Sequence, residues 1–127
     1  MLAQASLALG PAEVAERLEA IRAAHGSVLI VDEWRAPSGL VALHRYPTLD
    51  AARPVGLITM LVVAPTERRR GLGRALLKAA AQAARVAGCE DLEVTVRADQ
   101  AHLHAFCLAT GFVGAGDRLL RPLRKRS

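Results

Sequence analysis

The stretch that decides the fold is ITMLVVAPTERRRGLGRALLK, residues 58–78. It begins as a short apolar run that ends before Pro65, continues through a polar turn with three successive arginines, and becomes rich in alanine and leucine after Gly73. A short apolar run, a turn and a longer segment with apolar residues at helical spacing indicate a strand, a turn and a helix in that order.

The turn at the centre of this stretch predicts an anion site. A helix that begins directly after a glycine-containing turn presents unpaired backbone N–H groups and the positive end of its dipole. Gly71 and Gly73 would let the backbone approach an anion without Cβ atoms in the way. We therefore expect residues 69–74 to bind a phosphate group.

Spacing separates the known phosphate-binding patterns. No Gly-x-x-x-x-Gly-Lys-Ser/Thr string of a P-loop occurs in the chain. A dinucleotide fingerprint starting at Gly71 would need a glycine where Leu76 stands, and leucine is too large for that contact. What remains is Arg68-x-x-Gly71-x-Gly73 after Leu-Val-Val-x-Pro. A solvated basic turn before an ordinary helix is the alternative interpretation.

The Arg68-x-x-Gly71-x-Gly73 string resembles the coenzyme A pyrophosphate motif of the GNAT family of N-acetyltransferases. Residues 92–96 and 99–112 resemble the strand, helix and closing Gly-Phe that follow in the family, and residues 41–48 and 54–59 resemble its preceding paired strands. The resemblance covers about residues 11–123.

The resemblance implies an α/β fold of the α+β kind: a central mixed β-sheet flanked by helices, with the usual first strand of the family missing. In the family the central strand and the strand after the cofactor helix separate at a bulge, and the pantetheine arm of acetyl-CoA lies in the opening. The cofactor-binding residues implied here are Leu61, Val62, Val63, Arg68, Arg69, Arg70, Gly71, Leu72, Gly73, Arg74 and Gln100.

The implied reaction is transfer of the acetyl group of acetyl-CoA to a primary amine of a small molecule or a protein. It requires a neutral amine, a polarised thioester carbonyl and a proton for the departing thiolate. The family's proton-donating tyrosine falls at Cys107, and a thiol is a poorer donor. Where the family often has a glutamate base, this chain has Thr59 and Met60.

Two residues of an upstream strand remain as catalytic candidates besides Cys107. His44 can accept a proton near pH 7 and lies on a strand next to the expected acceptor cleft, although a surface or core histidine is the alternative interpretation. Tyr46 could donate a proton if it points inward. Glu93 and Thr95 share one face of a later strand and are interpreted as structural. We expect direct attack in a ternary complex, with no acetyl-cysteine intermediate.

Composition limits the remaining possibilities. The chain has 127 residues, 52% of them hydrophobic and 23% charged, which predicts a single domain over residues 1–127. No apolar run approaches the roughly 18 residues of a membrane span, and the first ten residues lack a signal-peptide pattern, so a cytoplasmic location is expected. Cys89 and Cys107 lie in no ligand array, so no metal site is predicted.

The net charge of +5 and the basic tail at residues 121–126 leave a nucleic-acid-binding domain as one alternative function. Only 3% of residues are aromatic and none forms a stacking platform beside the basic clusters, which disfavours it. The basic excess also argues weakly against a polycationic acceptor.

A second alternative is a non-catalytic acyl-CoA-binding module. Without its first strand the sheet would have an edge that a second subunit could cover, which favours a homodimer.

Periodicity and turn residues predict the remaining elements. The expected buried face of the cofactor helix consists of Leu72, Leu76, Ala79, Ala80 and Ala83. The expected strands are 27–34, 40–46 after a turn at 36–39, 54–63, 91–97 and a last one ending near Pro122; the expected helices are 2–9, 12–24, 71–87 and one to Ala109 with Asp99 as its N-cap.

Overall fold

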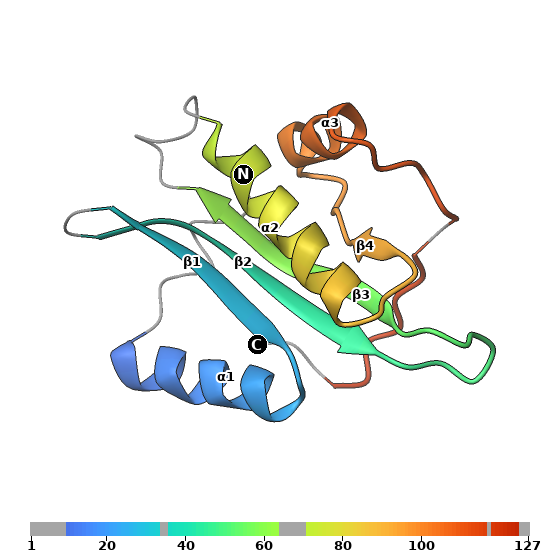
Figure 1. The fold of residues 1–127 in the computed structure, drawn as a ribbon, viewed down its shortest axis with the longest axis horizontal. Helices are drawn as coiled ribbons and strands as arrows, with labels where there is room; N and C mark the ends of the chain where they lie inside the picture. Colours follow the sequence, from blue (N-terminus) through green and yellow to red (C-terminus); the bar gives the residue numbers. More distant parts are fainter. Residues whose placement is uncertain (1–9, 34–35, 64–70, 117, 125–127) are drawn as a thin grey trace.

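The structure is a computed structural model that describes residues 10–33, 36–63, 71–116 and 118–124, with the backbone alone for residues 31–33 and 36–38. A twisted four-stranded sheet carries α2 across one face, with α1 near β1 and α3 near β4 (Figure 1). In chain order the elements are α1 Pro11–Ala23, β1 Ser27–Glu33, β2 Ala36–Tyr46, β3 Val55–Val63, α2 Leu72–Val86, β4 Leu92–Val94 and α3 Ala101–Ala109.

The sheet has the order β1-β2-β3-β4. Strands β1, β2 and β3 are antiparallel neighbours, whereas β4 runs parallel to β3 because α2 forms the crossover between them. The predicted mixed sheet flanked by helices is thereby confirmed.

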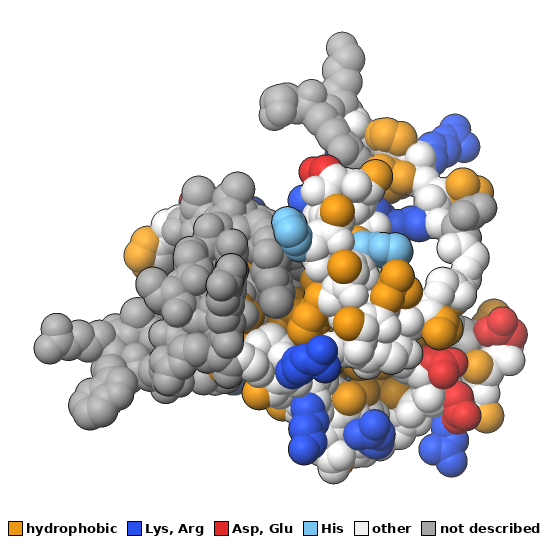
Figure 2. All heavy atoms as spheres, turned by 90° about the horizontal axis from the view of Figure 1, so that it is seen from above, with side chains coloured by type: hydrophobic (Ala, Val, Ile, Leu, Met, Phe, Trp, Pro, Cys, Tyr) orange, Lys and Arg blue, Asp and Glu red, His pale blue; other side chains and the backbone are white. Residues whose placement is uncertain are grey.

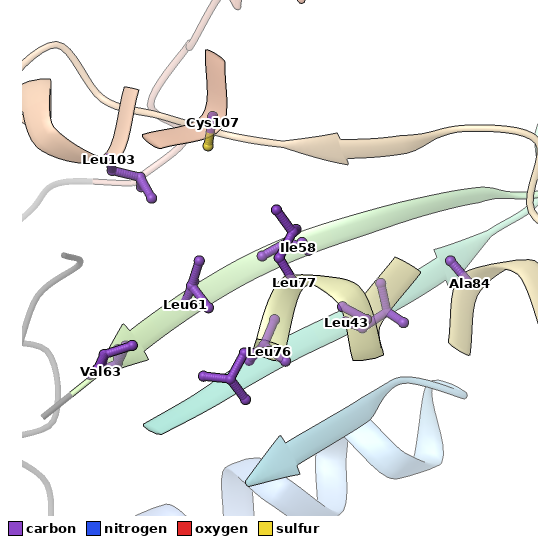
Figure 3. Close-up of a cluster of buried hydrophobic side chains, with 12 residues drawn as sticks. Leu43, Ile58, Leu61, Val63, Leu76, Leu77, Ala84, Leu103 and Cys107 are labelled. Carbon is purple, nitrogen blue, oxygen red and sulfur yellow. The ribbon is translucent and has the colours of Figure 1, made fainter. Parts of the chain in front are cut away.

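The hydrophobic core lies between the sheet, α2 and α3. Leu76, Leu77 and Ala84 of α2 face Leu43 of β2 and Ile58 of β3, and α3 adds further apolar side chains (Figure 3). The predicted face of α2 is correct at Leu76 and Ala80, which are buried, and at Leu72 and Ala83, which are partly buried against the core, but Ala79 is exposed. Leu77 and Ala84 are buried as well, because side chains three and four residues apart lie on the same face of a helix.

Gly39 lets α2 pack closely on β2. A Cβ atom at this position would lie 2.9 Å from Leu76 Cδ1 and 2.9 Å from the Val62 carbonyl oxygen. The turn predicted at residues 36–39 is wrong, because β2 already begins at Ala36, which pairs with Glu33. The glycine serves close packing of the helix against the strand rather than a turn.

Three further expectations about elements are corrected. The strand predicted over 91–97 is limited to Leu92–Val94, and no strand forms in the described parts of the C-terminal segment, where Leu119 and Leu123 are exposed. Pro122 lacks an N–H donor, and apolar content alone cannot form a strand without a partner. Asp99 is not the N-cap of α3; Gln100 is, and the Asp99 carboxylate instead accepts a hydrogen bond from Arg97 Nε at 3.4 Å. The helix predicted at residues 2–9 lies outside the described residues.

A β-bulge interrupts the pairing of β2 with β3. Ala42 pairs with Met60 and Leu43 with Ile58, so Thr59 is the extra residue of β3. Such bulges re-aim side chains and are common beside active sites. In the described part of the chain, no helix has the length and apolar character needed to cross a membrane.

Candidate active site

The most distinctive feature of the sheet is an opening between β3 and β4. The two strands pair only from Gly56–Leu92 to Ile58–Val94, whereas β3 continues to Val63. Beyond Ile58 no described strand adjoins β3 on this side, and Figure 1 shows the two strands separating toward α3. A strand edge without a partner presents free N–H and C=O groups.

The three predicted backbone contacts, Leu61, Val62 and Val63, line this opening. These residues are only 1%, 5% and 1% exposed, so their side chains hold the strand firmly in the core. Their backbones pair with β2 on one side only. Because successive residues of a strand direct their N–H and C=O groups to opposite edges, at least one of the three presents both groups to the opening.

The N-terminus of α2 follows β3 in the chain after a segment outside the described residues. Gly71 is its N-cap with φ 73°, in the left-handed region that favours glycine, and no side chain caps the helix. The first helical hydrogen bond runs from the Ala75 N–H to the Gly71 carbonyl, so the N–H groups of Leu72, Gly73 and Arg74 have no acceptor within the helix.

Positive charge lies along the same helix. Arg74, Lys78 and Arg85 are exposed at helical spacing on the outer side of α2, and Figure 2 shows basic side chains gathered on part of the molecular surface. Arg68, Arg69 and Arg70 lie outside the described residues. The described part of the predicted phosphate turn therefore combines N–H groups that have no acceptor within the helix with a basic surface, which suits an anion.

Gln100 begins α3 near the same end of the sheet. Its Oε1 accepts a hydrogen bond from the Arg97 backbone N–H at 2.9 Å, which fixes the side chain at the helix start. The amide nitrogen of the same side chain has two donors. This arrangement is compatible with the predicted contact to a pantetheine arm.

Strand β2 presents two different faces. Arg45 is directed to the α2 side, where its Nη1 donates to the Ala87 carbonyl at 3.3 Å. His44 and Tyr46 consequently share the opposite face, which we call the far face of the sheet. The register is continuous from Leu43 to Tyr46, so the strand is regular over this stretch and the alternation of its faces is kept.

His44 reaches the bulge of β3. Its Nε2 and the Thr59 Oγ1 share a hydrogen bond of 2.9 Å on the far face. Thr59 directly follows Ile58, the last β3 residue paired with β4. The histidine therefore stands beside the opening and is held by the extra residue of the bulge.

Tyr46 makes a contact that spans β3. Its hydroxyl donates to Glu93 Oε1 of β4 at 2.8 Å, and this hydrogen bond to a carboxylate is the main reason why the pKa of Tyr46 is raised. The phenol is therefore a neutral donor at physiological pH, with its proton directed at Glu93.

Cys107 lies in the core. Its side chain is 5% exposed among Leu103, Ile58 and Leu77 (Figure 3), and burial raises the pKa of its thiol. This position suits a small apolar side chain that packs α3 against the sheet.

The structure brings His44 together with Thr59 and Tyr46 together with Glu93, and it keeps Cys107 apart in the core. Sequence reasoning treated Thr59 only as a residue in place of a carboxylate, and Glu93 as structural. The β-bulge that aims Thr59 leaves no clear mark in one sequence. The Tyr46–Glu93 contact joins strands that are not neighbours, so local pattern could not reveal it.

Comparison with known proteins identifies the family. The profile of the Acetyltransferase (GNAT) family matches residues 4–112. No curated protein matches the sequence. An acetyltransferase from Trypanosoma brucei is similar in structure, with 24% identity, a TM-score of 0.76, and 91% of this chain and 81% of that chain covered.

Two structures of an aminoglycoside N-acetyltransferase are also similar, each with 19% identity. For the structure in complex with CoA the TM-score is 0.75, and the match covers 89% of this chain and 87% of that enzyme's chain. For the structure in complex with the bisubstrate analogue CoA-S-monomethyl-acetylneamine the TM-score is 0.77, and the match covers 93% of this chain and 82% of that enzyme's chain. With its family profile and its fold in agreement, this chain belongs to the GNAT acetyltransferase family.

Proposed function

We propose that the protein is an acetyl-CoA-dependent N-acetyltransferase that transfers the acetyl group to a primary amine of a small molecule or a protein. The observation that carries this proposal is the opening between β3 and β4 next to the N–H groups at the start of α2 that have no acceptor within the helix. Solved relatives of the same fold hold CoA or a CoA-containing analogue, which supports the choice of donor.

The chain's own groups fit a long molecule with phosphates at one end. The N–H groups of Leu72, Gly73 and Arg74 would hold the pyrophosphate, with Arg68, Arg69 and Arg70 as predicted further partners. The free edge of residues 61–63 would bind the pantetheine amides as a neighbouring strand would. Bound acetyl-CoA supplies a thioester whose carbonyl carbon forms the new C–N bond while its C–S bond breaks.

His44 and Thr59 would accept the proton of the amine. The 2.9 Å hydrogen bond between them allows the Thr59 hydroxyl to pass a proton to the His44 imidazole when Thr59 receives one from the amine. Loss of the amine proton to water remains a parallel route, so positioning of the amine in a ternary complex contributes most of the acceleration.

The departing thiolate would take its proton from water. Cys107 is buried and packs in the core, and the Tyr46 hydroxyl is directed at Glu93. Neither group is therefore placed as the main acid in this proposal. An acetyl-cysteine intermediate is not needed for direct attack by the amine.

The test is turnover of acetyl-CoA with a panel of primary amines, measured by release of the free thiol. Amine-dependent release that forms an N-acetyl product supports the proposal. Binding of acetyl-CoA without turnover of any amine in the panel would contradict it and would favour the non-catalytic acyl-CoA-binding module instead.

We also propose a cytoplasmic location and a homodimer. In the described part of the chain β1 has β2 as its strand neighbour on one side and none on the other. An unpaired edge is a ready surface for pairing. A single monomeric species in light scattering would contradict the dimer.

A further inference from the structure

The Tyr46–Glu93 pair lies on the far face of the sheet beside the candidate active site. It joins β2 to β4 across β3 by a 2.8 Å hydrogen bond from the phenol to Glu93 Oε1. Glu93 is exposed, and Tyr46 is 36% exposed. The contact therefore anchors one carboxylate oxygen of Glu93, while the residue as a whole stays exposed.

Strand register relates this carboxylate to His44. Leu57 of β3 pairs with His44 on one side and with Glu93 on the other, so the three residues form a row across the sheet. Neighbouring strands are roughly 4.8 Å apart, which separates the backbones of His44 and Glu93 by about 10 Å. Glu93 also directly precedes Val94, the last β4 residue paired with β3, so its side chain lies next to the opening.

Glu93 differs from three other acidic residues of the described chain in its side-chain partner. Glu19, Glu90 and Asp99 each lie within ion-pair distance of an arginine. The side-chain partner of Glu93 among the described residues is the neutral Tyr46 phenol. An accessible carboxylate next to an amine-binding site attracts cations, whatever the net charge of the whole chain.

We propose that Glu93, positioned by Tyr46, binds a second ammonium group of the acceptor, so that the preferred acceptors are amines that carry another cationic group several bonds from the reacting nitrogen. This inference rests on the proposed function, because it places the reacting amine at His44 and Thr59. In this proposal Tyr46 positions Glu93, and Glu93 determines which acceptors are preferred.

The experiment compares diaminobutane with n-butylamine, which share a chain length and differ in the second amino group. The measured quantity is the ratio of kcat/KM for the diamine to kcat/KM for the monoamine. A charge-assisted hydrogen bond discriminates by about 10- to 100-fold, so the wild-type ratio is expected in that range. Glu93→Gln should bring kcat/KM for the two amines close together, mainly by raising KM for the diamine. Tyr46→Phe should lower the ratio by a smaller factor.

Glu90→Gln is the matched control. It removes the same charge from an exposed glutamate that pairs with Arg53 at 3.4 Å, and it should leave the wild-type ratio. Equal kcat/KM for both amines in the wild type would overturn the inference, as would a ratio that falls equally in Glu90→Gln and Glu93→Gln. Failure of the proposed function looks different, because then neither amine is acetylated; calorimetric binding of diaminobutane that Glu93→Gln does not weaken would then overturn the ammonium site by itself.

Discussion

The two faces of β2 are formed by alternating residues of one strand, yet around the candidate active site they make different kinds of contact. On the α2 side Val41 and Leu43 are 0% and 6% exposed and belong to the core. On the far face His44 and Tyr46 make polar contacts to Thr59 and Glu93. Stability and chemistry are therefore divided between the two faces, so substitutions on each face should affect different measurements.

The largest expected effect is on the α2 side. Leu76 is 2% exposed, so Leu76→Ala removes buried methyl groups, leaves a cavity, and should lower the free energy of unfolding by about 3 kcal/mol. Urea unfolding followed by circular dichroism measures it. Leu108→Ala is the matched control, because Leu108 is 52% exposed on α3 and should change stability by less than about 0.5 kcal/mol. Equal losses in the two variants would contradict the assigned core.

Substitutions on the far face should lower the reaction rate rather than the stability. His44→Gln keeps a polar side chain but removes the proton acceptor, and we expect kcat to fall on the order of 10²-fold, the low end for general base catalysis. The unfolding midpoint should stay close to that of the wild type. Thr59→Val, which removes the partner at 2.9 Å, should lower kcat by a smaller factor. Full activity of His44→Gln across the pH range would assign the amine proton to water alone.

Cys107 tests whether the family's proton-donor position is still catalytic in this chain. Because its thiol is buried with a raised pKa, Cys107→Ala should cost about 1–2 kcal/mol of stability and lower kcat only modestly. Denaturant unfolding and steady-state kinetics of the same preparation separate the two effects. A folded variant that binds acetyl-CoA but has no activity would show that the thiol is the proton donor.

The smallest effect is expected from the Tyr46 hydroxyl. The pKa of Tyr46 is raised in the folded state by its hydrogen bond to Glu93, so its contribution to stability is complete below the unfolded value of 10.0 and is lost as pH rises through the higher folded pKa. The stability difference between wild type and Tyr46→Phe, at the low end of about 0.5–1.5 kcal/mol, should therefore vanish only above about pH 10. A difference that already disappears between pH 7 and 9 would contradict this.

The sequence predicted the α2 side much better than the far face. The strand β3 and the helix that begins after Gly71 depend on residues close together in the chain, so periodicity and glycine spacing predicted both the helix and the N–H groups at its start that have no acceptor within it. The His44–Thr59 and Tyr46–Glu93 pairs depend on a bulge and on strands brought together by the whole sheet. Leu119 and Leu123 show the opposite failure, since apolar residues suggested a strand where the described chain forms none.

The proposed acyl-CoA site at the opening and the start of α2 is tested by calorimetric titration of the wild type, Gly71→Asp and Gly71→Asn with acetyl-CoA. Both replacements tolerate the left-handed backbone of Gly71 better than other residues do, but only aspartate adds a negative charge. We predict wild-type binding on the order of 10 µM, a modest loss in Gly71→Asn, and at least about tenfold weaker binding in Gly71→Asp. A folded wild type that does not bind acetyl-CoA, or equal binding by the two variants, would contradict the account.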